Sequence, residues 1–205
     1  MALVTALAVA ACENTPAAAG ADQTGTENQA KKPNTGGYES QVAWGKHLVT
    51  VGLCEDCHSP KVMTAHGPEP DTSRTLSGHP AGAGVPDLVR DQLQIKGWAA
   101  TNEHLTAWAG PWGISFGANL TPDDTGIGNW TEQQFFTAIR KGKSKGMESS
   151  RALLPPMPWP NISQMTDDEL KAVFAYLKSL KPVKNAVPNP IPPVDTKAVS
   201  AAGGQ

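Results

Sequence analysis

Five consecutive residues, Cys54-Glu55-Asp56-Cys57-His58, constrain this chain more than any other feature of its sequence. Cysteines at positions i and i+3 lie on one face of a helical turn, so both sulfur atoms can bind a single rigid group. His58 follows directly and lies beside the same group. The chain has three cysteines, and an odd number that small cannot form a disulfide framework, so at least one cysteine needs a special use.

Three kinds of site can use this spacing. A thiol-disulfide pair needs a thioredoxin-like βαβ context, and no alternating strand pattern flanks the motif. A structural zinc site needs a second Cys or His pair at ligand spacing, and the chain has no other Cys-x-x-Cys. Cys-x-x-Cys-His is the attachment motif of c-type haem, in which the sulfurs bind two vinyl groups and the histidine binds iron. The motif therefore predicts one covalent haem c on Cys54 and Cys57, with His58 as proximal iron ligand.

A haem used for electron transfer needs a sixth iron ligand, and a methionine thioether is the usual partner of histidine. Met157 lies in the segment 154–160, where four prolines fix the backbone torsions around it. Because a stiff loop loses little entropy on binding, we predict Met157 as the distal ligand. Met147, in a Gly-rich basic segment, is the alternative, whereas Met63 follows His58 so closely that it reaches the opposite haem face with difficulty.

The apolar spacing predicts three helices. Residues 38–53 lead into the motif, residues 131–141 begin with a capping box, and residues 166–180 begin with a second capping box before Pro182 ends the helix. Met165 precedes that second box and is expected to staple it. Gly45 lowers helix propensity in the first helix, which predicts a close crossing by another helix. No segment alternates as a strand, so we predict an all-α fold.

About seventy Gly- and Pro-rich residues lie between His58 and Asn129. We expect this long insert to cover a haem face and to include short helical turns, for instance at residues 86–96. The other histidines lack positional support as iron ligands: one lies on the first helix, packed or at the surface, and three lie in loops that we expect to be solvated. These are His47, then His66, His79 and His104.

The two ends of the chain differ from the middle. Residues 2–11 of the predicted signal peptide, residues 1–11, form an apolar run, too short for the roughly 20 residues of a spanning helix. The run resembles a bacterial lipoprotein signal, which predicts lipid on Cys12, although no Lys or Arg precedes that cysteine; an unmodified Cys12 on an Ala-rich terminus is the alternative. Residues 12–37 lack large apolar side chains and are predicted to be a flexible tether, and residues 188–205 a disordered Pro/Ala/Gly tail. The folded domain is then 38–187.

Three stretches, residues 45–58, 119–131 and 154–180, resemble the bacterial mono-haem cytochrome c family, in particular the cytochrome subunits of periplasmic dehydrogenases. The resemblance spans about residues 36–188. It implies an all-α cytochrome c fold whose first and last helices cross, with haem bound through Cys54 and Cys57, His58 proximal and Met157 distal. The long insert departs from a minimal cytochrome c, and one motif implies one haem and one electron at a time.

The expected function is therefore electron transfer in the periplasm, between a dehydrogenase or quinol-oxidising donor and a terminal oxidase or another cytochrome, with a lipid anchor on the membrane. A net charge of −2 gives no reason to bind nucleic acid. One alternative is a haem peroxidase or gas sensor with an open sixth position, and another is a structural or metal-storage lipoprotein without haem.

A short basic cluster, residues 140–145, is expected to be a solvated helix end, with a docking surface for an acidic partner as the alternative.

Overall fold

The computed structural model describes residues 33–85, 93 and 96–194, which belong to one compact unit beginning at Pro33. The predicted lipoprotein signal, Cys12 and most of the predicted tether lie outside the described residues. So do nearly all of the predicted helical turn at 86–96 and residues 195–205 of the predicted tail. No helix in the described part of the chain is both long enough and apolar enough to span a bilayer.

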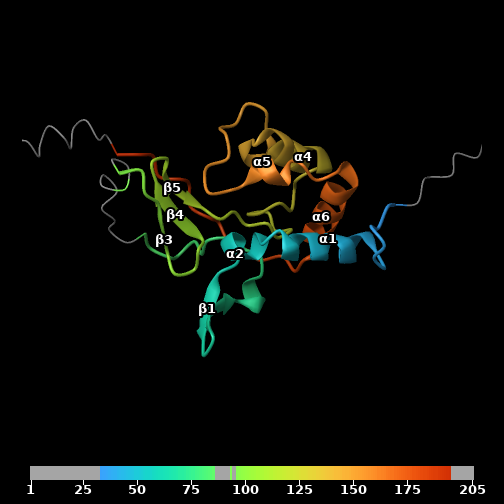
Figure 1. The fold of residues 1–205 in the computed structure, drawn as a ribbon, viewed down its shortest axis with the longest axis horizontal. Coiled ribbons are helices and arrows are strands. Elements are labelled where there is room, and N and C mark those ends of the chain that lie inside the picture. Colours follow the sequence, from blue (N-terminus) through green and yellow to red (C-terminus); the bar gives the residue numbers. More distant parts are fainter. Residues whose placement is uncertain (1–32, 86–92, 94–95, 195–205) are drawn as a thin grey trace, which may run out of the picture. The chain divides into compact units, whose positions relative to one another are not determined.

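Helices form where the capping signals predict them (Figure 1). The helical elements are α1 (Gln41–Val51), α2 (Cys54–His58), η1 (Thr72–Arg74), α4 (Glu132–Lys141), η2 (Ser144–Gly146), α5 (Trp159–Ile162) and α6 (Asp167–Ser179). The Ser40 side chain caps α1, and both predicted capping boxes are present, Thr131 with Gln134 and Thr166 with Glu169. Each box satisfies backbone N–H groups that have no partner inside the helix.

The first and last long helices pack directly against each other, as predicted. A Cβ atom placed on Gly45 of α1 would lie 1.9 Å from the carbonyl oxygen of Ala172 in α6. The missing side chain therefore lets the two helix backbones approach to contact. Around this crossing lies the hydrophobic core, which is supplied mainly by α1, α4 and α6: Trp44, Leu48, Val49, Leu76, Ile127, Phe135, Ile139, Leu170, Ala172, Val173, Tyr176 and Leu177.

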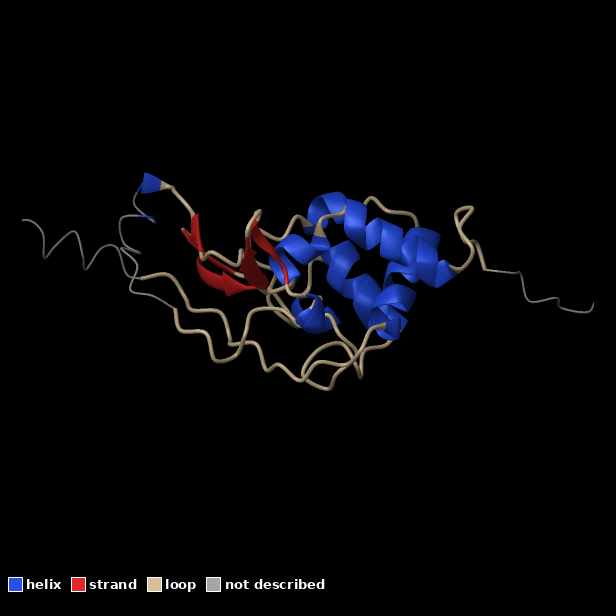
Figure 2. Ribbon diagram, turned by 90° about the horizontal axis from the view of Figure 1, so that it is seen from below, coloured by secondary structure: helices blue, strands red, loops and turns tan. Residues whose placement is uncertain are grey.

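The all-α prediction is wrong in one respect, because the insert contains two small antiparallel sheets. β1 (Lys61–Thr64) pairs with β2 (Gly67–Pro70), and β4 (Ala107–Gly110) pairs with both β3 (Ala100–Thr101) and β5 (Gly113–Phe116). In Figure 2 the three-stranded sheet and the long helices α1, α4 and α6 occupy separate regions of this unit. Strands of two to four residues are too short for a period of two to be visible in the sequence.

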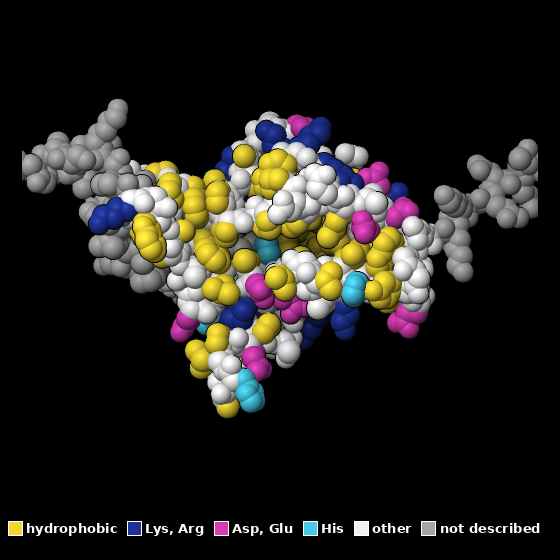
Figure 3. Space-filling model, viewed as in Figure 1, with side chains coloured by type: hydrophobic (Ala, Val, Ile, Leu, Met, Phe, Trp, Pro, Cys, Tyr) yellow, Lys and Arg dark blue, Asp and Glu magenta, His cyan; other side chains and the backbone are white. Residues whose placement is uncertain are grey.

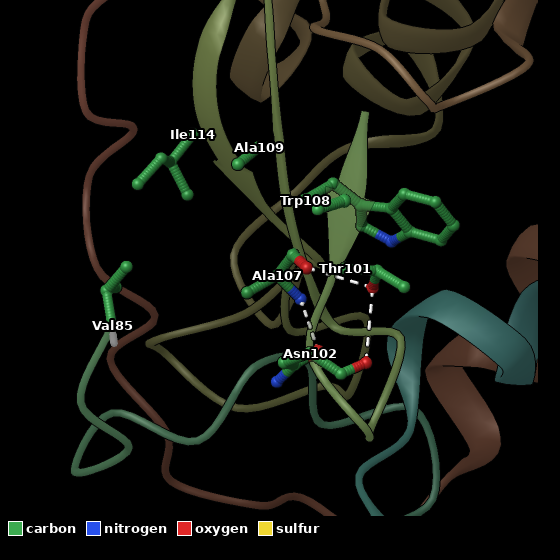
Figure 4. A pocket seen from close by; sticks show the side chains of 8 residues that line it. Val85, Thr101, Asn102, Ala107, Trp108, Ala109 and Ile114 are labelled. Carbon is green, nitrogen blue, oxygen red and sulfur yellow. Dashed lines mark hydrogen bonds between the residues drawn. The ribbon is translucent and has the colours of Figure 1, made fainter. Parts of the chain in front are cut away.

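Side chains and tight turns hold the larger sheet in place. The Asn102 side chain accepts hydrogen bonds from the backbone of Thr106 and Ala107, which shapes the turn between β3 and β4 (Figure 4). Gly113 adopts a φ of 93° at the next turn, a conformation that glycine tolerates at no steric cost. Ile191 exchanges two backbone hydrogen bonds with Ile114, so this part of the predicted tail runs along β5.

Candidate functional site

The Cys-x-x-Cys-His motif forms its own helical turn, α2, directly after α1. Gly52 ends α1, with its N–H donating to the Leu48 carbonyl, and Leu53 then adopts a left-handed conformation with φ of 55°. This break redirects the chain before the two cysteines. Both cysteines are half-buried, and His58 at the end of the turn is buried. The predicted site residues of the motif are thus presented by one rigid turn.

His58 is oriented by a backbone carbonyl of the insert. Its Nδ1 lies 2.8 Å from the carbonyl oxygen of Ala118. A carbonyl can only accept, so Nδ1 carries the proton, and Nε2 has no hydrogen-bond partner in the described part of the chain. Burial lowers the pKa of His58 and keeps the ring neutral. A neutral imidazole with one nitrogen anchored and the other free has the geometry of a metal ligand.

The two cysteines are protonated thiols rather than reactive thiolates. Burial raises the pKa of Cys54 to about 11, and it also raises the pKa of Cys57, which the nearby positive charge of Lys61 partly opposes. Catalytic disulfide exchange needs a lowered thiol pKa, so this environment does not favour a redox Cys-x-x-Cys. No three His, Cys, Asp or Glu side chains among the described residues converge as a zinc site would require.

The insert packs tightly on the motif, a contact that sequence reasoning missed. A Cβ on Gly117 would lie 2.0 Å from the carbonyl oxygen of Cys57, so residue 117 must lack a side chain to reach α2. The Gly117 N–H donates to the Thr106 carbonyl, which ties this contact to the start of β4. Ala118, the partner of His58, is the next residue. The sheet of the insert therefore positions the carbonyl that orients the histidine.

Lys61 is a second contact that the sequence did not indicate. This lysine is the first residue of β1 and is 6% exposed. Its Nζ donates three hydrogen bonds to backbone carbonyls, to Glu55 at 2.9 Å, Asp56 at 2.9 Å and Ser59 at 2.8 Å. These carbonyls belong to α2 and to the residue after it, and the Glu55 carbonyl also accepts from the backbone N–H of Ser59. The C-terminal end of the motif is therefore closed by a buried ammonium group.

Met157, in the predicted ligand loop of residues 154–160, faces the hydrophobic core. It is half-buried and packs against the hydrophobic core, as Cys54 does. The loop is fixed at its start, because the Ser115 hydroxyl of β5 donates to the Pro155 carbonyl at 2.6 Å. The alternative ligands fit less well: Met147 is 45% exposed and Met63 is 70% exposed. Met165 packs on the core as Met157 does, and it lies next to the cap of α6.

The surface beside the motif can accept a flat apolar group. Figure 3 shows a hollow between the α1–α2 segment and the segment that carries α4 and α5. Hydrophobic side chains surround this hollow, and one histidine side chain lies in it. An apolar hollow, two protonated thiols on one turn and a histidine with a free Nε2 fit the requirements of a covalently attached haem.

The prediction that His79 is solvated is wrong. His79 is 1% exposed, its Nδ1 lies 3.0 Å from the Thr106 hydroxyl, and its ring packs on Phe116 with 4.8 Å between centroids. The cause is the turn at Gly78, whose N–H donates to the His58 carbonyl and draws the loop into the unit. His104 is partly buried, with 30% of its side chain exposed.

Two of the four cations in the basic cluster form ion pairs within the chain. Arg140 forms an ion pair with Asp167 at 2.7 Å, and Lys141 forms one with Glu148 at 2.5 Å. The Lys143 ammonium donates to the Ser150 carbonyl. These contacts favour the helix-end interpretation over a docking surface, because the cations already have partners beside the C-terminus of α4.

The fold and the motif agree with a comparison against known families. A family model described as Cytochrome c matches residues 42–181, well over half of the chain. The chain belongs to the cytochrome c family. The match begins within α1 and ends just after α6, so it includes the crossing helices, the motif and the Met157 loop. A cytochrome c with a Cys-x-x-Cys-His motif binds haem c covalently.

Curated relatives are subunits of bacterial dehydrogenases. One subunit of the nicotinate dehydrogenase of Pseudomonas putida is 37% identical over 158 residues, which are 76% of this chain and 10% of the relative. The gluconate 2-dehydrogenase cytochrome c subunit of Pantoea cypripedii is 28% identical over 72% of this chain and 25% of the relative. The cytochrome c subunit of the quinone-type alcohol dehydrogenase of Gluconobacter oxydans is 37% identical over 36% of this chain and 15% of the relative. The chain thus spans a quarter or less of these relatives.

Proposed function

We propose that this cytochrome c is the electron-transferring haem domain of a dehydrogenase complex, with one haem bound through Cys54 and Cys57 and ligated by His58 and Met157. The observation that carries the proposal is the hydrogen bond from His58 Nδ1 to the Ala118 carbonyl. It fixes the tautomer in which Nε2 is free to bind iron. A histidine that binds iron needs one ring nitrogen anchored and the other free, which is the arrangement of His58.

The residues of the chain have separable tasks in this proposal. Each protonated thiol of the motif would hold haem by adding its S–H across one vinyl group, an addition that needs no oxidant. Haem, once bound, supplies a one-electron couple between ferric and ferrous iron. His58 is held neutral and correctly oriented by burial and by Ala118. Met157 would supply the second iron ligand through its sulfur, and its packing against the core holds the side chain in place for this role.

The partners follow from the relatives only as part of the proposal. Their names describe subunits of enzymes that oxidise nicotinate, gluconate or alcohols. A dehydrogenase subunit is therefore the proposed electron donor, and a terminal oxidase or another cytochrome is the proposed acceptor. We also propose a periplasmic location with a lipid anchor at Cys12, which is supported by the apolar run before that cysteine.

The first test asks whether haem is attached at all. The full chain is expressed in a host with a haem c maturation system, separated on a denaturing gel and stained for haem. We expect a stained band that is lost in the double variant Cys54→Ser/Cys57→Ser. An unstained band at full expression would contradict the proposal. Rapid binding of carbon monoxide to the ferrous protein would instead indicate an open sixth position, as in a gas sensor or peroxidase.

A further inference from the structure

Every N–H donor of the Lys61 ammonium group has a hydrogen-bond acceptor. An ammonium has three N–H donors and no acceptor, and all three donors of Lys61 are used on the carbonyls of Glu55, Asp56 and Ser59. Only the protonated amine can donate three hydrogen bonds, so the group is a cation. Among the described residues it forms no ion pair within 4 Å of a carboxylate, although the charges of Asp56 and Glu55 act on it from farther away.

The Lys61 ammonium group contacts the backbone of the Cys-x-x-Cys-His motif. Two of its carbonyl partners lie between Cys54 and Cys57, and the third directly follows His58. The contact therefore holds the turn that carries both attachment sites and the proximal ligand. Lys61 is also 6% exposed, so water screens its charge far less than that of a surface lysine.

We propose that Lys61 is a positioning residue of the haem site that also raises the reduction potential of the haem. The proposal rests on the haem attachment proposed above. Ferric iron carries one more positive charge than ferrous iron, so a fixed cation against the backbone of the attachment turn disfavours the ferric state. The three hydrogen bonds also fix the backbone of the turn that carries the two cysteines and His58. Lys61 thus combines a mechanical and an electrostatic role.

The test compares variants that separate charge from size. Lys61→Met removes the charge at similar length, Lys61→Gln removes the charge but keeps two donors, and Lys61→Arg keeps the charge. Lys46→Met is the matched control, because Lys46 is exposed on α1 and its loss changes the net charge equally. Haem staining is scored first, and the midpoint potential of each haem-loaded protein is then measured by redox titration.

We expect both neutral variants to shift the ferric-to-ferrous ratio at a fixed potential about tenfold toward ferric, which is ~59 mV for one electron. The Arg variant and the Lys46 control are expected to stay close to the parent. Unchanged potentials in haem-loaded neutral variants would overturn the inference and leave the proposed function intact. If neither neutral variant retains haem, retention in Lys61→Arg supports the positioning role, whereas loss of haem from Lys61→Arg as well contradicts the inference, because a cation at this position would then not restore the site. An absence of haem from the parent would refute the proposed function itself.

Discussion

The backbone contact between the two long helices gives a prediction whose size can be worked out. A Cβ on Gly45 would lie 1.9 Å from the carbonyl oxygen and 2.5 Å from the carbonyl carbon of Ala172, and 2.8 Å from Cβ of Tyr176. None of these atoms is the end of a flexible side chain. In Gly45→Ala, α1 and α6 must therefore move apart, because no rotamer change can make room.

Two opposing effects set the magnitude. Replacing Gly by Ala inside a helix gains about 1 kcal/mol of helix propensity. Overpacking a well-packed contact costs about 1–3 kcal/mol, and rigid backbone neighbours place this site at the upper end. The expected net loss is about 2 kcal/mol in the free energy of unfolding. For a domain of this size that loss lowers Tm by about 4–8 °C.

The assay is guanidinium unfolding of the haem-loaded protein, followed by far-ultraviolet circular dichroism. Gly82→Ala is the matched control, because a Cβ there meets no atom within 4 Å and the backbone is not left-handed. We expect the control to stay within about 0.5 kcal/mol of the parent. A Gly45→Ala protein as stable as the control would refute the close crossing of α1 and α6.

Two further predictions concern the insert. Ser115→Ala removes the hydroxyl that donates to the Pro155 carbonyl, so we expect a loss of about 1 kcal/mol and easier displacement of Met157 at high pH. A pH titration of the ferric absorption checks this, with Ser115→Thr as the control that keeps the hydroxyl; equal titrations would contradict it. Hydrogen bonds from Ser73 and Arg74 lower the pKa of Asp71 to about 2 from 3.8. The stability that this carboxylate contributes is complete above its ordinary pKa and is lost as the pH falls toward 2. The difference in unfolding free energy between the parent and Asp71→Asn is therefore expected to shrink between about pH 4 and pH 2, and a constant difference would contradict the assignment.

Local signals in the sequence predicted the helices and the motif. Capping boxes at Thr131 and Thr166 depend on residues three positions apart, so they can be found without the fold. The attachment turn is equally local. Gly45 also predicted a long-range contact. A glycine lowers helix propensity, so its presence in an amphipathic helix indicated a close crossing by another helix, and the structure shows that crossing at Ala172.

Long-range contacts could not be predicted in the same way. The carbonyl that orients His58 belongs to Ala118, sixty positions away, and any residue could supply it. The hydroxyl that fixes the Met157 loop belongs to Ser115, forty positions before its acceptor, Pro155. Both partners lie in or just after β5, a strand too short to leave a pattern. The long insert therefore supports the residues proposed on both sides of the haem, although its composition suggested only a covering loop.

The central claim is that Met157 completes the haem site opposite His58. Methionine bound to ferric haem iron gives a weak far-red absorption band, which is lost when the sulfur leaves. We predict this band in the parent and also in Met147→Ala, because the Met147 side chain is 45% exposed and does not pack on the core. We predict its loss in Met157→Ala, together with a lower reduction potential. A band that persists in Met157→Ala, or that is absent from the haem-loaded parent, would contradict the account.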